Sequence, residues 1–247
     1  MHTQDLIVRF DRATAMQNRS HAVMAQRTES KDSIDDFPTP PWATRALLEH
    51  VLPRFSDVSM QNCLEPACGA GHMDKILREY FRETAASDVF DYGYSDVKEF
   101  LSSPYPVNSY DWVITNPPFR LAEEFVAKAR AIARVGVAIL ARTVFIESVG
   151  RYDRLFKPHP PVAFAQFVER VPMVKGRLDQ KASTATGYAW FVWTAESCSS
   201  TDLIWIPPCR KELEISKDYE LPAPRILNKQ SDLFEFNVGT RQAEATG

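Results

Sequence analysis

The chain has 247 residues, of which 45% are hydrophobic and 25% are charged, a composition typical of a globular domain with a sizeable core. A formal net charge of −3 excludes a uniformly basic surface, so a polyanionic partner would have to contact a local patch. No apolar run is long enough to cross a bilayer, and the N-terminus lacks a basic region followed by an apolar stretch. We therefore expect a cytoplasmic protein with no membrane partner.

The segments at the two ends of the chain differ from its middle. Residues 1–35 are polar with alternating charges, which predicts an N-terminal extension. Residues 36–208 contain the periodic apolar segments and are expected to form one domain. The charged, proline-containing remainder, 209–247, is expected to be a loosely packed C-terminal tail. Cysteines at positions 63, 68, 198 and 209 lack a paired Cys-x-x-Cys spacing, so we expect reduced thiols and no metal site.

The first motifs in chain order flank a predicted helix. The segment Phe37-Pro38-Thr39-Pro40-Pro41-Trp42 places proline at a helix start. A strand then runs into Glu65-Pro66-Ala67-Cys68-Gly69-Ala70-Gly71, which enters an amphipathic helix over residues 73–81. Glycines in such a turn let a ligand approach the backbone, and the helix N-terminus supplies unpaired N–H groups. The turn matches no phosphate-binding fingerprint, and glycine also occurs in strand-to-helix turns for structural reasons alone.

A second strand is predicted over residues 84–89 and ends in a carboxylate. A carboxylate at that position can accept hydrogen bonds from both hydroxyls of a ribose. Asp88 is the preferred candidate for this role, and Asp91 is the alternative.

The stretch Asp111–Phe119 places a short apolar strand directly before Asn116-Pro117-Pro118-Phe119. Two prolines end the strand at Asn116 and fix the turn. The Asn116 side-chain oxygen and the Pro117 carbonyl would then accept both hydrogens of a planar amine, such as N6 of adenine, while the base stacks on Phe119. A strand-terminating turn is the structural alternative.

The remaining pattern alternates helices and strands. Residues 122–132 and 143–156 are predicted helices, and 135–140, 162–168 and 188–193 are predicted strands, with 203–206 as a further strand at the edge. Such alternation predicts a parallel sheet with right-handed crossovers, in which ligands bind at the carboxyl ends of the strands.

The proline segment, the Glu65–Gly71 loop and the Asn116–Phe119 tetrad, in this order, resemble the gamma-type S-adenosylmethionine-dependent DNA methyltransferases that act on adenine N6. The layout is also similar to small phage and prophage enzymes of that kind, and the resemblance covers roughly residues 36–208. It implies an α/β, Rossmann-like class I methyltransferase fold. Its sheet would be mostly parallel and seven-stranded, with an antiparallel last strand.

The resemblance also implies roles for individual residues. The catalytic residues would be Asn116, Pro117, Pro118 and Phe119. S-adenosylmethionine would contact Thr39, Pro40, Glu65, Pro66, Ala67, Gly69, Gly71, Asp88, Glu99, Phe100 and Asn116. Glu99 stands where the family usually has an aspartate, so Asp96 is an alternative for that contact.

The expected substrate is an adenine in duplex DNA, extruded from the helix to reach the tetrad. Methylation of adenine in RNA, methylation of glutamine in a protein, and a non-catalytic nucleic-acid-binding module are the alternatives. An antiparallel last strand would place the connection 169–187 over the catalytic face. Its basic residues would then contact DNA, unless the loop is merely solvated: Arg170, Lys175, Arg177 and Lys181.

Overall fold

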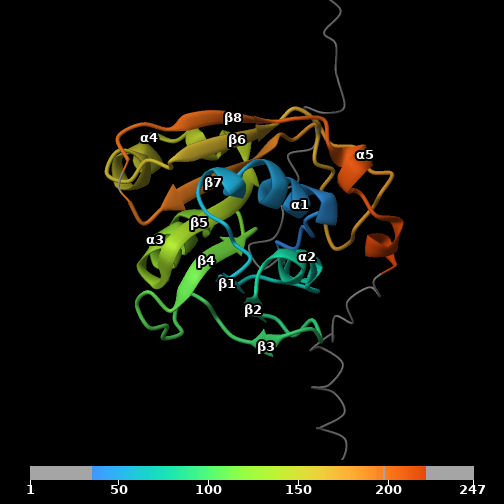
Figure 1. Cartoon of the computed structure of the whole chain (residues 1–247), viewed down its shortest axis with the longest axis horizontal. Coiled ribbons are helices and arrows are strands. Elements are labelled where there is room, and N and C mark those ends of the chain that lie inside the picture. Colours follow the sequence, from blue (N-terminus) through green and yellow to red (C-terminus); the bar gives the residue numbers. More distant parts are fainter. Residues whose placement is uncertain (1–34, 197, 221–247) are drawn as a thin grey trace, which may run out of the picture. The chain divides into compact units, whose positions relative to one another are not determined.

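The structure, a computed structural model, describes residues 35–196 and 198–220. The expected N-terminal extension, residues 1–35, therefore lies outside the described residues except for Asp35. The described part contains one eight-stranded sheet with helices on both faces (Figure 1). The strand order is β3-β2-β1-β4-β5-β7-β6-β8.

The strands of the left half of this order, β3 to β5, pair in parallel. β7 is antiparallel to both of its neighbours, β5 and β6, and β8 pairs with β6 in parallel. The strands are β1 (Asn62–Glu65), β2 (Glu83–Asp88), β3 (Asp96–Val97), β4 (Tyr110–Thr115), β5 (Ala133–Arg142), β6 (Ala163–Phe167), β7 (Tyr188–Thr194) and β8 (Asp202–Ile206).

This topology confirms the predicted α/β, mostly parallel sheet with an antiparallel strand after the sixth. The sheet has eight strands in the described residues rather than seven, because Asp202–Ile206 pairs along the whole of β6 and extends the edge. The antiparallel strand β7 therefore lies inside the sheet, between β5 and β6.

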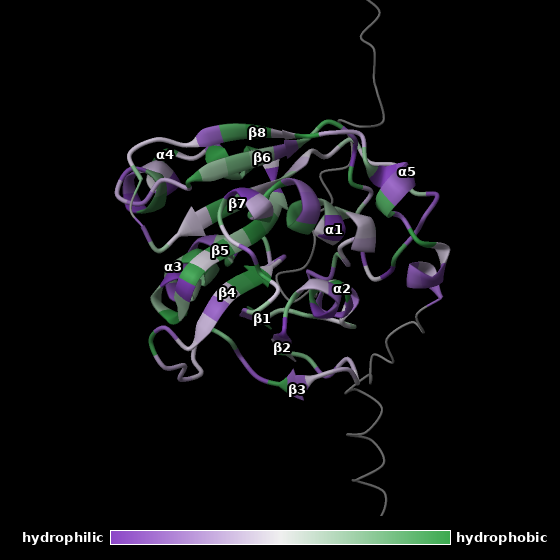
Figure 2. Ribbon diagram, in the orientation of Figure 1, coloured by the Kyte–Doolittle hydropathy of each residue, from purple (hydrophilic) through white to green (hydrophobic). Residues whose placement is uncertain are grey.

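The longer helices are α1 (Pro41–His50), α2 (His72–Tyr80) and α3 (Ala122–Ile132). α1 and α2 share one core cluster with side chains such as Trp112 and Trp190, whereas α3 packs on the other face with Val113 and Phe191. Alternate residues of β4 thus belong to different clusters, which is the period-two pattern of a sheet covered on both faces. Figure 2 shows the hydrophobic character of β5 and of the end of β4 at the centre of this arrangement.

The predicted helix over 143–156 is interrupted at residues 147–148. It is divided into η2 (Thr143–Ile146), a 3-10 helix, and a continuous helical segment in which α4 (Val149–Arg151) passes directly into the π-helical η3 (Tyr152–Phe156). Ser148 is extended, and its hydroxyl accepts a hydrogen bond from the Arg151 backbone N–H, so it ends one turn and caps the next. Such local side-chain bonds compete with a continuous helix.

The first part of the predicted C-terminal tail is packed, not loose. Residues 209–220 contain α5 (Arg210–Leu213) and η4 (Ser216–Tyr219). Arg45 of α1, 4% exposed, forms a 2.6 Å ion pair with Asp218, 8% exposed. Removing this segment would leave Arg45 as a buried charge without Asp218, which is destabilising. The folded domain therefore extends at least to this segment. None of the helices in the described residues is long and apolar enough to span a membrane.

Candidate active site

The parallel strands bring their terminal side chains to one edge of the sheet. Glu65 and Asp88 end β1 and β2, Asn116 follows β4, and Arg142 ends β5. Tyr188 begins the antiparallel β7 and pairs with Arg142, so it lies at the same edge. This is the carboxyl edge, at which α/β sheets bind their ligands.

Asn116 presents a buried acceptor atom at this edge. Its Nδ2 donates a 2.8 Å hydrogen bond to the carbonyl of Phe37. Because a carbonyl only accepts, this bond fixes the amide orientation and leaves Oδ1 on the other side. Oδ1 is buried and has no hydrogen-bond partner in the described part of the chain. An unpaired buried acceptor is costly, so it marks a position that a ligand donor would complete.

The turn after Asn116 is held at two points. The carbonyl of Pro118 accepts a 2.9 Å hydrogen bond from Leu121, so the bond that closes the turn does not use the Pro117 carbonyl. The Phe119 N–H donates to Asp35 Oδ2 at 2.8 Å. Phe119 is therefore anchored through its backbone, while its ring remains partly exposed.

Three side chains surround the Phe119 ring. Phe37 lies 5.4 Å away between ring centroids and Tyr188 lies 6.3 Å away, both tilted. The Arg142 guanidinium stands over the ring, 4.1 Å from its centroid. Tyr188 is 3% exposed; burial raises its pKa, against the opposing charge and hydrogen bond of Arg142.

The Glu65–Gly71 loop contains one open glycine and one that is packed. Both have positive φ, 52° at Gly69 and 79° at Gly71. A Cβ on Gly69 would meet only Asp36 Oδ1, at 3.9 Å, whereas one on Gly71 would lie 2.2 Å from the Tyr94 ring. The second glycine therefore makes room for Tyr94, and the close approach expected for a ligand is left to Gly69. Pro66 is buried and Ala67 partly buried within the loop.

Glu65 carries a second unpaired buried acceptor. It is 2% exposed and accepts a hydrogen bond from the backbone of Asp74, in the first turn of α2. Its Oε2 has no hydrogen-bond partner among the described residues. Burial, and then the charges of Asp74 and Asp88, hold the pKa of Glu65 well above its ordinary value.

The two candidates for the ribose site differ clearly in environment. Asp88 is 8% exposed and accepts from Gly69 N at 2.8 Å and Phe90 N at 3.0 Å. Burial raises its pKa above the ordinary value, although these backbone bonds lower it. Asp91 is exposed and accepts from Gly93 N within its own turn. Asp88 is thus the carboxylate in direct contact with the candidate cofactor loop.

A third carboxylate, Asp36, joins this group. Burial and the charges of Asp88 and Asp35 raise its pKa to about 6, despite the opposing charge of Lys175. Asp36, Glu65 and Asp88 therefore form an acidic cluster around Gly69. Like charges held together out of water favour a cation among them.

Four further residues were expected to contact the cofactor: Thr39, Pro40, Glu99 and Phe100. Thr39 is 4% exposed with an unpaired Oγ1 among the described residues, and Pro40 is the residue before α1. Glu99 accepts from the backbones of Leu101 and Ser102; burial tends to raise its pKa, but these bonds hold it below the ordinary value. Phe100 is 1% exposed in the core beside Phe125. Both residues thus have contacts within the fold.

The connection 169–187 leaves β6 and enters β7 at the carboxyl edge, as the expected topology requires. Its first part is anchored, because Val171 is fully buried and Met173 is 7% exposed. Its turn contacts the segment before α1 through a 2.9 Å bond from Gly176 N to the Asp36 carbonyl. The four predicted DNA-binding residues on it are exposed: Arg170, Lys175, Arg177 and Lys181.

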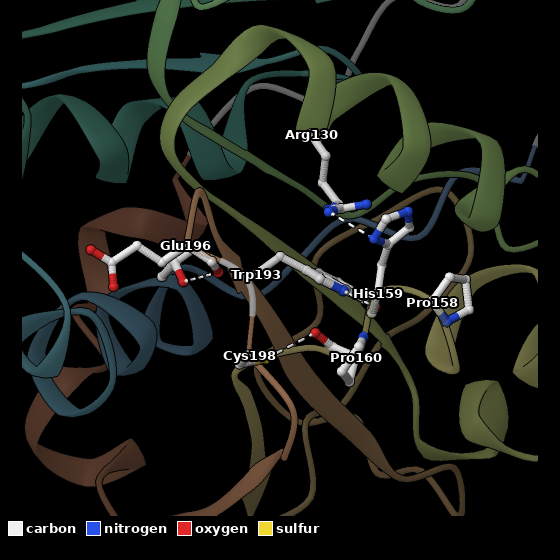
Figure 3. A pocket seen from close by; sticks show the side chains of 8 residues that line it. Arg130, Pro158, His159, Pro160, Trp193, Glu196 and Cys198 are labelled. Carbon is white, nitrogen blue, oxygen red and sulfur yellow. Dashed lines mark hydrogen bonds between the residues drawn. The ribbon is translucent and has the colours of Figure 1, made fainter.

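A hollow elsewhere on the domain does not belong to this site (Figure 3). It is lined by residues that include Arg130, His159 and Trp193. Thr194, also in its wall, pairs with Gly136 near the start of β5, so the hollow lies at the edge opposite Arg142. Its polar groups already bond to one another, as Trp193 Nε1 does to the His159 carbonyl at 2.9 Å.

Sequence reasoning missed Asp35, Asp36, Arg142 and Tyr188. The Asp35-Asp36 pair directly precedes the proline segment, and that position was a usable signal. Arg142 and Tyr188 reach Phe119 only through the pairing of β5 with β7, so no local pattern announces them.

No model of a protein family and no curated protein matches the chain. Its fold is similar to a protein from Listeria monocytogenes assigned as a class I S-adenosylmethionine-dependent methyltransferase, with 12% identity and a TM-score of 0.52 over 70% of this chain and 67% of that one. It is also similar to a modification subunit assigned to a type I restriction enzyme of Vibrio vulnificus, with 13% identity and a TM-score of 0.50 over 89% of this chain and 56% of that one. The chain thus spans little more than half the length of that subunit. The fold is that of the class I methyltransferases.

Proposed function

We propose that the protein transfers a methyl group from S-adenosylmethionine to the exocyclic N6 of an adenine in DNA. The observation that carries the proposal is the buried Asn116 Oδ1, which has no partner among the described residues. It lies in a turn of the sequence Asn-Pro-Pro-Phe at the carboxyl edge of a class I methyltransferase fold.

The tetrad suits a planar amine. Asn116 Oδ1 and the Pro117 carbonyl would accept one N–H each, which holds the amine in the plane of the base and directs the nitrogen lone pair toward the methyl donor. The donated hydrogen bond also satisfies an acceptor whose burial without a partner costs about 1–3 kcal/mol. Pro118 fixes the turn, and Phe119 offers an aromatic face beside it.

The acidic cluster suits the cofactor. S-adenosylmethionine, when bound, supplies an activated methyl group on a cationic sulfonium and carries an ammonium group as well. Glu65 and Asp36 would bind such a cation, which would lower the cost of keeping their carboxylates charged out of water. Asp88 would accept the ribose hydroxyls, and Gly69 would let the cofactor approach the backbone.

The other cofactor contacts follow from the resemblance. Thr39 and Pro40 would contact the methionine end, where the unpaired Thr39 Oγ1 is available among the described residues. Glu99 or Asp96 would accept from the cofactor's adenine amine. The protein needs no base at N6, because the proton of the methylated ammonium is lost to water.

DNA is the proposed polymer for two reasons. The exposed cations of the 169–187 connection lie at the edge that holds the acceptor turn, which gives a chain of net charge −3 a local basic patch. The Vibrio vulnificus protein of similar fold is assigned as a modification subunit of a restriction enzyme. In duplex DNA the adenine would leave the stack at a cost of a few kcal/mol.

The test is a methyl-transfer assay with labelled S-adenosylmethionine and separate samples of DNA, RNA and bulk protein. After digestion, we expect N6-methyladenine from DNA with the wild type and none with Asn116→Ala. Duplexes of only guanine and cytosine are the matched control and should remain unlabelled. Label in RNA adenine or in glutamine would replace DNA by that acceptor. The absence of label in all three polymers would leave a non-catalytic module.

A further inference from the structure

Arg142 occupies a face of the ring on which the acceptor base would stack. Its guanidinium carbon lies 4.1 Å from the centroid of Phe119 and 6.0 Å from that of Phe37. A planar guanidinium stacks on aromatic rings, and a base stacked on the same face would need the same space. Phe37 and Tyr188 also lie near the ring, both tilted to it. A base that stacks on the face covered by the guanidinium must therefore displace Arg142.

The guanidinium is hydrogen-bonded to Tyr188 but is incompletely bonded where it lies. Its Nε is buried and has no hydrogen-bond partner within the described residues. Arg142 ends β5 at the carboxyl edge, and the following residue, Thr143, is tied to Gly187 by a 2.9 Å backbone bond. The backbone at this position is thus fixed, so a base would be admitted by movement of the Arg142 side chain alone.

The rim of the carboxyl edge, at the start of β7, carries a second positively charged side chain that could bind phosphate. Arg170 Nη1 lies 3.3 Å from the point that a Cβ on Gly187 would occupy, which places a second guanidinium beside the start of β7. Arginine forms paired, charge-assisted hydrogen bonds with phosphate that are stronger than a stacking contact. A nucleotide drawn out of a strand brings its flanking phosphates to this rim together with its base.

We propose that Arg142 guards the acceptor pocket and restricts transfer to adenines carried by a polynucleotide. A base that brings a phosphate gives the displaced guanidinium a new partner, and a free nucleoside does not. This inference rests on the proposed function, because it concerns the acceptor of that same reaction. Arg142 acts here as a specificity-determining residue, separate from the tetrad that holds the amine.

The experiment measures kcat/KM for methyl transfer to adenosine and to a short single-stranded oligonucleotide that contains one adenine. A single strand removes the cost of extruding the base from a duplex. The wild type is expected to prefer the oligonucleotide. Arg142→Ala should lower kcat/KM for the oligonucleotide by about tenfold or more, because a charged hydrogen bond is lost, and should not lower it for adenosine.

Two further variants separate charge from packing. Arg142→Gln keeps a planar group against Phe119 but has no charge, so it should lose the oligonucleotide preference as the alanine variant does. Arg142→Lys keeps the charge and should recover part of that preference. Arg82→Ala is the matched control, because Arg82 is exposed and directly precedes β2, at the opposite edge of the sheet. It should leave both rates unchanged.

The outcomes distinguish this inference from the proposed function. Parallel losses on both acceptors, or an unchanged ratio, would show that Arg142 only supports the fold, and methylation by the wild type would still stand. A wild type that uses adenosine as well as the oligonucleotide would also overturn the guard. Transfer to neither acceptor would overturn the role of Arg142, and if duplex DNA were also unlabelled it would refute the proposed function as well. Calorimetry of S-adenosylmethionine binding checks that each variant is folded.

Discussion

Asp35 Oδ2 lies 2.8 Å from the backbone nitrogen of Phe119 and accepts its hydrogen. Prolines at 117 and 118 have no N–H, so Phe119 carries the first backbone donor after Asn116. Asp35, which directly precedes Asp36 of the acidic cluster, therefore positions the turn that would hold the acceptor.

Replacing Asp35 by alanine should impair catalysis more than folding. The Phe119 N–H would lose its acceptor, and the ring would no longer be held in one place. We expect kcat to fall by about tenfold and the free energy of unfolding to fall by about 1–2 kcal/mol, measured by steady-state assay and urea denaturation. Asp202→Ala, an exposed carboxylate on β8, is the control. An unchanged kcat would show that the turn keeps its conformation without the Asp35 hydrogen bond.

Asn116→Ala should abolish methyl transfer and leave cofactor binding nearly intact. The side chain contacts the acceptor amine more than the donor, and its remaining bond is to the Phe37 carbonyl. Calorimetry would measure S-adenosylmethionine affinity, and the labelled-cofactor assay would measure turnover. Near-normal turnover in this variant would disprove the catalytic assignment.

Asp88→Ala should weaken cofactor binding by about 2–3 kcal/mol, because a charged acceptor for two hydroxyls is lost. Asp91→Ala is the matched control, since Asp91 is an exposed carboxylate in a neighbouring turn. Titration calorimetry of both variants decides between them. If Asp91→Ala is the weaker binder, the ribose contact moves to Asp91.

Asp36 should make both stability and cofactor binding depend on pH. Its ordinary pKa is 3.8, and burial with neighbouring carboxylates raises it to about 6. A pKa raised on folding means that Asp36 favours the folded state below 3.8 and that this contribution is lost as the pH rises through about 6. Asp36→Asn should therefore stabilise the protein against urea at pH 7.5 more than at pH 5.

Folding favours the protonated form of Asp36, whereas the cationic cofactor should favour its charged form. At pH near 6, binding should release a proton, which calorimetry in buffers of different ionisation enthalpy would detect. Asp36→Asn should reduce that release, with Asp202→Asn as the control. Equal release in wild type and variant would remove Asp36 from the cofactor site.

The triple replacement of Lys175, Arg177 and Lys181 by alanine should weaken DNA binding to all sequences. Each lost phosphate contact should flatten the slope of log affinity against log salt by about 0.9 for duplex DNA. Cofactor affinity should not fall, because the only cation of the three that acts on Asp36, Lys175, competes with the cofactor for that carboxylate. The control removes three exposed cations that each precede a parallel strand, at the opposite edge: Arg54, Arg82 and Lys157. An unchanged salt slope would leave the arginines of residues 1–34 as the better DNA contact.

Local patterns predicted those parts of the fold that depend on neighbouring residues. α3 has the predicted bounds, Ala122–Ile132, because its apolar residues repeat with the helical period and face one cluster. The helix expected over 143–156 is interrupted because the Ser148 hydroxyl accepts a hydrogen bond from the backbone N–H of Arg151. Apolar periodicity does not register that competition.

The candidate site also has parts that the sequence predicted and parts that it did not. The tetrad and the glycine loop are each contiguous in sequence, so their residue types were enough to predict them. The Arg142–Phe119 contact joins residues 23 positions apart through strand pairing, and the Asp35–Phe119 bond spans 84. Contacts of that kind depend on which strands pair and in which register. Patterns in a single sequence predict the order of the elements along the chain but not that pairing.

The segment Asp35–Phe37 supplies partners to Asn116 and Phe119 but no strand or helix of the described part. A shortened chain that begins at Pro38 would keep every one of those elements and lose these partners. The length of chain needed to fold and the length needed to assemble the acceptor pocket are therefore different. A truncation series across this boundary would separate the two properties within a few residues. A folded but inactive protein should be found just past it, with a lower cofactor affinity because Asp36 is also lost.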